Sequence, residues 1–395
     1  MITEARHVFT REQVRIDPDR GTALVEPGTG GATAAGPAEW VFCPPLIDLQ
    51  VNGAMGVDLQ DLSLTEADFM VLCRGLARAG TAAWLPTLIT DAADRLERKA
   101  ALLGMFIRNW HRYPADEAGA RPLGIHLEGP FLSPEDGARG AHPRKHVQPA
   151  SIEAFSRILA ASGGTVWYVT LAPEVSGGLE LIAHLRQREP RMLIGIGHTL
   201  ADGSTIRRAC EAGARICTHL GNGLPALLHR HQNPVWSQLA EERLYASFIP
   251  DLHHLPESVL TAMVRAKGPE RSLFVSDAVC LAGEPPGTYD LFGTTVEKRP
   301  DGRVCLAGTD LLAGSGTLLL EGLLRACGEG VLSLETAWQG GFRVPARLTA
   351  CFGQVAPFAA DGTIRNGILL RTERREDGTV RYTPEAVWIN GCRVK

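Results

Sequence analysis

Eight short apolar runs, most of them followed by a helical pattern, restrict the fold of this chain more than any other feature. The runs occupy residues 46–51, 82–89, 123–127, 165–171, 192–196, 215–218, 244–249 and 272–276. Residues 65–79 fit one helix that ends at Gly80. One face of the next helix carries Leu96, Ala100, Leu103 and Ile107. Strands alternating with helices predict βαβ units and a parallel sheet.

Eight such units are what a closed (β/α)₈ barrel of the TIM type requires. The alternative is an open doubly wound sheet, but no glycine-rich dinucleotide motif follows the first run. Ser151 and Asp202 stand where helix N-caps are needed. The pattern therefore favours the barrel.

A length of 395 residues leaves room for a second, smaller domain. The segment 27–36, PGTGGATAAG, predicts a loop that separates an N-terminal unit from the main body. The tail, 361–395, contains Asp-Gly and Asn-Gly pairs between short alternating runs, which indicate hairpins. We expect residues 1–43 and 354–395 to build one small β-sandwich-like domain, and 44–353 to form the barrel.

Composition excludes several classes of function. The chain has 40 basic and 44 acidic residues, which gives no electrostatic reason to expect nucleic acid or an anionic membrane as a partner. No apolar run has signal-peptide character or approaches the ~20 residues that span a bilayer. The nine cysteines are scattered and form no C-x-x-C pair, which predicts reduced thiols in a cytoplasmic protein.

Polar side chains end four of the eight apolar runs. Glu128, His198, His219 and Asp277 follow the third, fifth, sixth and eighth runs. Singly, each could be a structural residue or a helix cap. Together they point to one site, because the C-terminal ends of barrel strands form the active site. One carboxylate and two imidazoles suit Zn²⁺ with an open position for water, although Fe²⁺ and Mn²⁺ also accept these ligands.

From about Pro44 to Gly353 the chain resembles the N-acetylglucosamine-6-phosphate deacetylase family of the amidohydrolase superfamily. The strings that carry the resemblance are, in order, PPLIDLQVNG, PTLIT, GIHLEGPFLSPEDGARGAH, TLAPE, GHT, THLGNGLP, SDA, AGS at 313–315 and PARL at 345–348. HLEGPF followed by TLAPE is specific to this family, whereas GHT or SDA alone is weak. The resemblance implies release of acetate from an N-acetyl amino sugar, with N-acetylglucosamine 6-phosphate as the first expectation.

Matching positions imply the roles of five residues. Glu128, His198 and His219 hold the metal. Asp277 takes a proton from the attacking water and then gives one to the leaving amine. His142, in GARGAH, steadies the carbonyl oxygen as it becomes negative, a contribution worth about 3–4 kcal/mol.

Gln50 and Asn52 stand two apart in the first strand, so both point into the barrel. The wider superfamily often has His-x-His here, which binds a second metal. Amides are far poorer ligands than imidazole. We therefore expect one catalytic metal ion and a vestigial second position.

The residues expected to bind the sugar match the family less closely. Its Asn-Ala-Met turn reads Asn222, Gly223 and then Leu in this chain. Arg230 matches an arginine that contacts the 6-phosphate, often from the neighbouring subunit, which implies a homodimer; a solvated surface arginine is the alternative. His254 matches a substrate-facing histidine, but the preceding family glycine is Leu252 here. These departures leave open a related N-acetyl sugar, phosphorylated or not.

Two other functions compete with this one. A different amidohydrolase reaction, such as cyclic-amide hydrolysis or deamination, usually goes with His-x-His on the first strand, which is absent. A non-catalytic barrel typically loses metal ligands, whereas all those expected for a single metal are present. Deacetylation is therefore the favoured interpretation.

Overall fold

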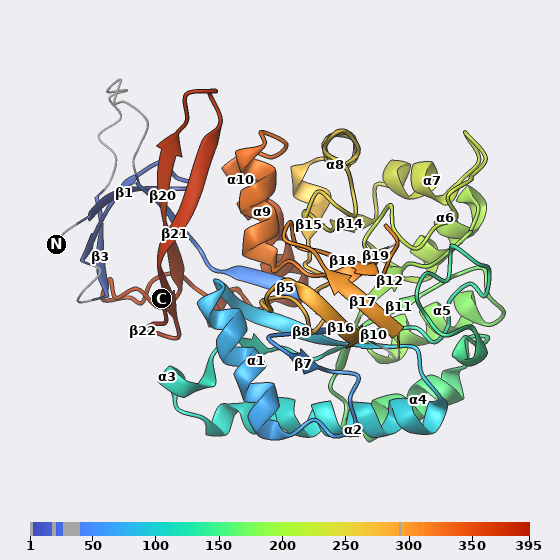
Figure 1. The fold of residues 1–395 in the computed structure, drawn as a ribbon. Coiled ribbons are helices and arrows are strands. Elements are labelled where there is room, and N and C mark those ends of the chain that lie inside the picture. Colours follow the sequence, from blue (N-terminus) through green and yellow to red (C-terminus); the bar gives the residue numbers. More distant parts are fainter. Residues whose placement is uncertain (1–2, 18–20, 27–39, 292–293, 311) are drawn as a thin grey trace.

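The computed structural model describes residues 3–17, 21–26, 40–291, 294–310 and 312–395, and its main body is a barrel (Figure 1). Eight parallel strands lie side by side in chain order, which confirms the predicted (β/α)₈ fold. They are β5 (Leu46–Val51), β8 (Thr81–Ile89), β10 (Ile125–Glu128), β11 (Val166–Leu171), β12 (Leu193–Ile196), β13 (Ile216–Cys217), β14 (Tyr245–Phe248) and β15 (Ser272–Phe274). A two-residue strand, β9 (Arg121–Pro122), also pairs with β8.

The first and last strands meet just beyond β15. Val51 and Ala278 form a parallel bridge, and the Asp277 N–H donates to the Gln50 carbonyl at 3.0 Å. The buried Asp48 carboxylate accepts from the Ser276 N–H at 3.1 Å, and burial raises the pKa of this carboxyl to about 7. Closure therefore sets the backbone position of Asp277.

Helices surround the barrel (Figure 1), and most of them bury one apolar stripe. Those that follow the strands are α1 (Glu66–Arg78), α2 (Ala93–Asn109), α4 (Ile152–Ala161), α5 (Gly178–Arg188), α6 (Gly203–Ala212), α7 (Pro234–Ala240), α8 (Glu257–Lys267) and α9 (Leu319–Gly328). Thr65 caps α1, and the side chains of Ser151 and Asp202 accept from N3 backbone N–H groups of α4 and α6. The predicted N-caps are confirmed, since each satisfies a backbone donor that the helix leaves free.

Shorter helices complete the chain. They are α3 (Ala115–Ala118), α10 (Leu334–Trp338), the π-helical turn η4 (Gln339–Arg343), α11 (Val344–Thr349), and the 3₁₀ turns η1 (Trp110–Arg112), η2 (Arg144–His146), η3 (Pro269–Arg271) and η5 (Phe352–Gln354). The η4 turn packs closely against β15 and β5. A Cβ at Gly340 or Gly341 would clash with these strands.

Both ends of the chain build one separate seven-stranded sheet beside α9 (Figure 1). Its order is β22 (Cys392–Arg393), β21 (Val380–Ile389), β20 (Gly367–Arg374), β4 (Trp40–Cys43), β1 (Thr3–His7), β2 (Gln13–Asp17) and β3 (Thr22–Glu26). Asn390 and Gly391 turn between β21 and β22 with φ of 55° and 82°, as the Asn-Gly signal predicts. The loop predicted at 27–36 lies outside the described residues, and the domain boundaries at 43/44 and 353/354 stay predictions.

An antiparallel sheet follows β15 that the sequence pattern did not predict. It contains β16 (Gly287–Leu291), β17 (Thr294–Lys298), β18 (Arg303–Leu306) and β19 (Leu312–Ser315). Ser315 bridges Ala278, the residue directly after Asp277. This sheet, like the hairpin β6 (Gly53–Ala54) and β7 (Val57–Asp58), therefore borders the C-terminal end of the barrel.

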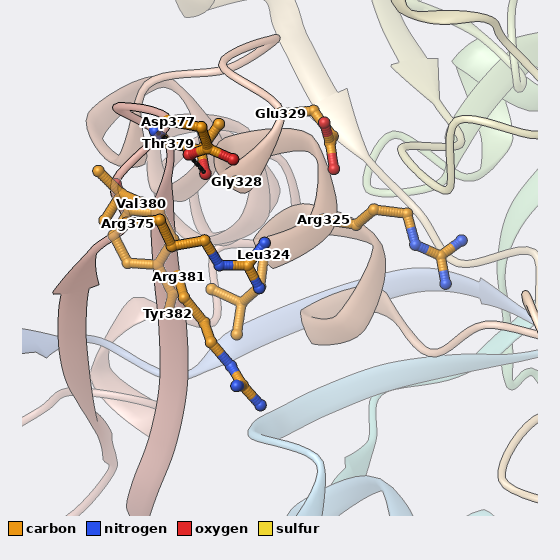
Figure 2. A pocket seen from close by; sticks show the side chains of 10 residues that line it. All are labelled: Leu324, Arg325, Gly328, Glu329, Arg375, Asp377, Thr379, Val380, Arg381 and Tyr382. Carbon is orange, nitrogen blue, oxygen red and sulfur yellow. Dashed lines mark hydrogen bonds between the residues drawn. The ribbon is translucent and has the colours of Figure 1, made fainter.

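A surface groove, the character of the helices and the state of the cysteines complete the description. A groove of about 350 Å³ lies between α9 and the β20–β21 hairpin, and Figure 2 shows Arg325 extending from α9 away from that hairpin. Within the described chain, every helix is too short or too polar to cross a bilayer. All nine cysteines are free thiols, seven of them buried.

Candidate active site

Three of the predicted side chains meet at the C-terminal ends of their strands. Glu128 is the last residue of β10, and His198 and His219 each lie two residues beyond β12 and β13. All three are buried, and their ligand atoms lie within 4.8 Å of one another. The barrel therefore gathers the expected metal-binding group from segments 70 and 91 residues apart in sequence.

His198, His219 and Asp277 share an unusual backbone conformation. Their φ angles are 50°, 32° and 50°, in the left-handed region that non-glycine residues rarely adopt. Such residues cost about 1–3 kcal/mol each and cluster at functional sites. The strain turns the chain sharply after each strand, so that the side chain points across the barrel mouth.

The hydrogen bonds of His198 make this group suitable for a cation. Its Nδ1 lies 2.8 Å from the carbonyl oxygen of Ala138, which only accepts, so Nδ1 carries the proton. In a neutral ring, Nε2 then carries no proton and directs its lone pair at Glu128 Oε1, 3.2 Å away. Two acceptors at this distance need a positive charge between them. A carbonyl that fixes the ring in this way is typical of metal-binding histidines.

Charge is concentrated on Glu128 and His219. Burial alone would raise the pKa of Glu128, but the neighbouring His198 and His219 rings hold it well below its ordinary value. Burial alone would lower the pKa of His219, but the hydrogen bond with Glu128, at 2.7 Å, raises it to about 9. Without an ion these two residues form an imidazolium–carboxylate pair. The same donor atoms fit a divalent ion in place of the proton.

Asp277 lies beside this group, and one of its carboxylate oxygens accepts hydrogen bonds from two side-chain amides. Gln50 Nε2 and Asn52 Nδ2 donate to its Oδ1 at 3.0 and 2.7 Å, and Gln50 Nε2 also donates to Glu128 Oε2 at 3.1 Å. Burial, followed by the charge of Glu128, raises the pKa of Asp277 to about 6. Gln50 and Asn52 thus face the site as predicted, and their N–H groups hold the carboxylates.

His142 joins the group from a loop after β10. It is buried, and its ring meets that of His198 edge to face, with 4.5 Å between centroids. Burial, followed by the charge of His198, lowers the pKa of His142 to about 3, so the ring is neutral near pH 7. Thr90 lies directly after β8, and its Oγ1 is 2.9 Å from His142 Nδ1. The strand-end rule that selects Glu128 would also have selected Thr90.

The turn expected to hold the sugar lies against His198. Asn222 Nδ2 donates to the His219 carbonyl at 3.2 Å. Gly223 has φ +59°, and a Cβ there would lie 2.6 Å from His198 Nδ1. In this chain a side chain at position 223 would therefore force the His198 ring or the turn to shift.

His254 is held by a carboxylate. Its Nδ1 lies 2.8 Å from Asp251 Oδ2, while the backbone N–H groups of His253 and His254 donate to Asp251 Oδ1. Leu252 keeps a left-handed φ of 62°, the conformation that a glycine adopts without strain. Asp251 Oδ2 also lies 3.5 Å from the hydroxyl of Ser315, which bridges Ala278 directly after Asp277, so this loop borders the same site.

Arg230 is the predicted residue that the fold does not bring to the cluster. Its side chain is exposed, and its carbonyl accepts from the indole of Trp236 at 3.0 Å. Leu227 and Trp236, in the same segment, are 91% and 55% exposed. In the part of the chain that the structure describes, no contact joins Arg230 to the buried group.

Comparisons with known proteins agree on one family. Over 99% of this chain and 98% of its own length, the N-acetylgalactosamine-6-phosphate deacetylase of Escherichia coli O157:H7 is 33% identical. The N-acetylglucosamine-6-phosphate deacetylase of Bacillus subtilis (strain 168) is 34% identical over 72% of this chain and 69% of its own. The crystal structure of the N-acetyl-D-glucosamine-6-phosphate deacetylase from Mycobacterium smegmatis superposes with a TM-score of 0.78 at 26% identity, with full coverage of both chains. No family model matches this chain.

Proposed function

Because the chain belongs to the N-acetylhexosamine-6-phosphate deacetylases of the amidohydrolase superfamily, we propose that it hydrolyses N-acetylglucosamine 6-phosphate to glucosamine 6-phosphate and acetate. The observation that carries the proposal is the buried group of Glu128, His198 and His219 with the half-buried Asp277 beside it. Its two parts, the Glu128–His198–His219 group and Asp277, supply what amide hydrolysis needs. One can bind a cation, and the other can move a proton.

Glu128 Oε1, His198 Nε2 and His219 Nε2 are the atoms that would hold one divalent ion, most simply Zn²⁺. When bound, such an ion lowers the pKa of a water toward ~7 and polarises the acetyl carbonyl. Ala138 keeps the His198 lone pair aimed inward. Gln50 and Asn52 would take the place of second-metal ligands, and their amides donate to Asp277.

Asp277 removes the proton of the attacking water and later protonates the departing amine. The amides of Gln50 and Asn52 fix its Oδ1, which leaves Oδ2 for proton transfer. His142 donates to the carbonyl oxygen as negative charge develops on it. His254 and the Asn222–Gly223 turn orient the sugar ring.

An assay of acetate release tests the proposal. The panel contains N-acetylglucosamine, N-acetylgalactosamine, N-acetylmannosamine and their 6-phosphates, each with and without a chelator. We expect the 6-phosphate of N-acetylglucosamine to have the highest kcat/KM and the chelator to abolish turnover. Equal turnover of the unphosphorylated sugar would remove the proposed role of Arg230.

N-acetylgalactosamine 6-phosphate is the second candidate substrate. The relative that aligns with 99% of this chain is named for that sugar. The two substrates differ only at C4, so the same panel distinguishes them. A kcat/KM that is higher for the galactose epimer would replace the first substrate and leave the chemistry unchanged.

We also propose a homodimer in which Arg230 serves the partner subunit. Its exposed segment, with Leu227 and Trp236 uncovered, supports this assignment. Mixed dimers of Asp277→Asn and Arg230→Ala chains test it, because one of the two sites would then regain both residues. Recovery of activity on mixing is expected, whereas a monomer by light scattering would contradict the dimer.

A metal analysis of the purified chain tests the cofactor. We expect one bound ion per chain and prefer zinc, because two imidazoles and one carboxylate suit it. Two tightly bound ions would contradict the role given to Gln50 and Asn52. We assign the protein to the cytoplasm on its nine free cysteines, which imaging of a tagged chain can check.

A further inference from the structure

His142 is held at one ring nitrogen by a single residue, Thr90. The hydroxyl oxygen of Thr90 lies 2.9 Å from His142 Nδ1, and the Thr90 backbone N–H points at the same atom from 3.4 Å. Both residues are buried, with 2% and 4% of their surfaces exposed. Among the described residues, both hydrogen bonds of the His142 ring go to Nδ1 and none goes to Nε2. One nitrogen is therefore anchored, and the other is available.

The anchor decides where the proton of His142 resides. A backbone N–H only donates, so its approach favours a lone pair on Nδ1, but at 3.4 Å this contact is weak and the hydroxyl at 2.9 Å decides. A proton on Nδ1 would place two N–H groups face to face and leave the hydroxyl hydrogen without an acceptor. With Nδ1 unprotonated, the hydroxyl also donates to it, and the single proton of the neutral ring is on Nε2.

We infer that Thr90 is a positioning residue for the proposed deacetylation, on which this inference rests: it keeps the proton of His142 on Nε2, aimed at the acetamide carbonyl oxygen. A neutral ring with the opposite tautomer would present a lone pair to an oxygen that is becoming negative. Such a ring would repel the developing charge. The hydrogen bond from Thr90 therefore selects the form of His142 that can stabilise it.

Two neighbours hold this pair in place. Gly129, directly after Glu128, has φ +84°, and a Cβ there would lie 2.3 Å from Thr90 Oγ1. The glycine thus makes room for the hydroxyl next to the metal-binding group. On the other side, the Arg139 guanidinium donates to the carbonyl oxygens of Gly140 and His142. The His142 ring is thereby fixed through both its backbone and its Nδ1.

Thr90→Val tests the inference because it removes the hydroxyl while keeping the shape and the backbone N–H. Loss of a residue that orients a functional group typically costs about 10–100-fold. We expect kcat to fall by that factor, KM to stay within about twofold, and Thr90→Ser to recover most of the loss. Thr90→Ala is a second variant. It also removes the hydroxyl but, unlike valine, places no methyl group at the hydroxyl's position.

Thr81→Val is the matched control. Thr81 is equally buried, on the same strand β8 but at its opposite end, so the same substitution there should leave kcat unchanged. In a His142→Gln background, Thr90→Val should cause no further loss, because the group that it orients is gone. An unchanged kcat for Thr90→Val, or an equal loss for Thr81→Val, would refute the positioning role.

The tautomer itself can be observed without substrate. Long-range ¹H–¹⁵N spectra of histidine-labelled protein, with His142 assigned through His142→Gln, should show Nε2–H in the wild type and a mixture in Thr90→Val. An Nδ1–H ring in the wild type would overturn the inference. Failure of the wild type to release acetate would instead reject deacetylation. The spectrum would still show whether the hydrogen bond with Thr90 keeps the His142 proton on Nε2.

Discussion

The buried centre of the barrel mouth and the rim around it are built differently. In the centre, Glu128, His198 and His219 are at most 7% exposed, and each makes a hydrogen bond within the site. On the rim, Asn222 is half-buried, and Arg230 is exposed without a contact to the centre in the described part of the chain. The centre is preorganised, whereas the rim residue Arg230 makes no contact with it among the described residues.

The contrast indicates that the centre governs the chemical step and that the rim governs substrate selectivity. Charges aligned in a dry site act strongly and need no reorganisation during the reaction. An exposed guanidinium contributes little until a phosphate desolvates it. Changes in the centre should therefore alter kcat, and changes on the rim should alter KM and substrate preference.

The largest expected effect comes from Asp277→Asn in the centre. The amide keeps the shape but cannot accept the water proton, so kcat should fall about 10³–10⁴-fold. Metal content, measured on the purified protein, should stay unchanged because Asp277 is outside the proposed ligand group. Near-normal turnover would show that another group is the base.

Gly223→Ala tests where the rim touches the centre. The new Cβ would meet His198 Nδ1 at 2.6 Å and disturb its bond to Ala138. We expect metal affinity and kcat to fall about 10–100-fold. Gly164→Ala is the control, since its φ is +78° but nothing lies within 4 Å of a Cβ. Equal losses in both variants would attribute the effect to backbone strain alone.

Arg230→Ala should affect the rim only. A charged hydrogen bond to phosphate is worth about 1.5–3 kcal/mol, so KM for the 6-phosphate should rise about 10–100-fold. The kcat should change little, and the unphosphorylated sugar should be turned over as by the wild type. A similar loss with both sugars would instead place Arg230 in the general stability of the segment.

The smallest effect is expected in the scaffold that both regions share. Thr65 caps α1 in a reciprocal capping box with Asp68. Thr65→Ala should lower the free energy of unfolding by about 1 kcal/mol, measured by urea denaturation. If kcat or KM also changed by more than about twofold, the scaffold and the site would not be independent.

Several parts of the fold follow from local patterns. The run 46–51 coincides with β5, and 65–79 differs from α1 only by its cap and last residue, because apolar period and capping chemistry are local properties. The sheet from β16 to β19 was not predicted, because β16 and β17 are only five residues long and their alternation between exposed and more buried residues is correspondingly short. The roles of the site residues stay predictions until the variants above are measured.

The apolar pattern of the sequence specifies the barrel and the polar residues at its strand ends, because the C-terminal ends of all barrel strands lie at one face. Only the tertiary structure decided that Thr90 faces His142, that Gln50 and Asn52 donate to Asp277, and that Gly223 touches His198. These contacts join segments far apart in the chain. They depend on barrel closure and on left-handed turns, which no local pattern specifies.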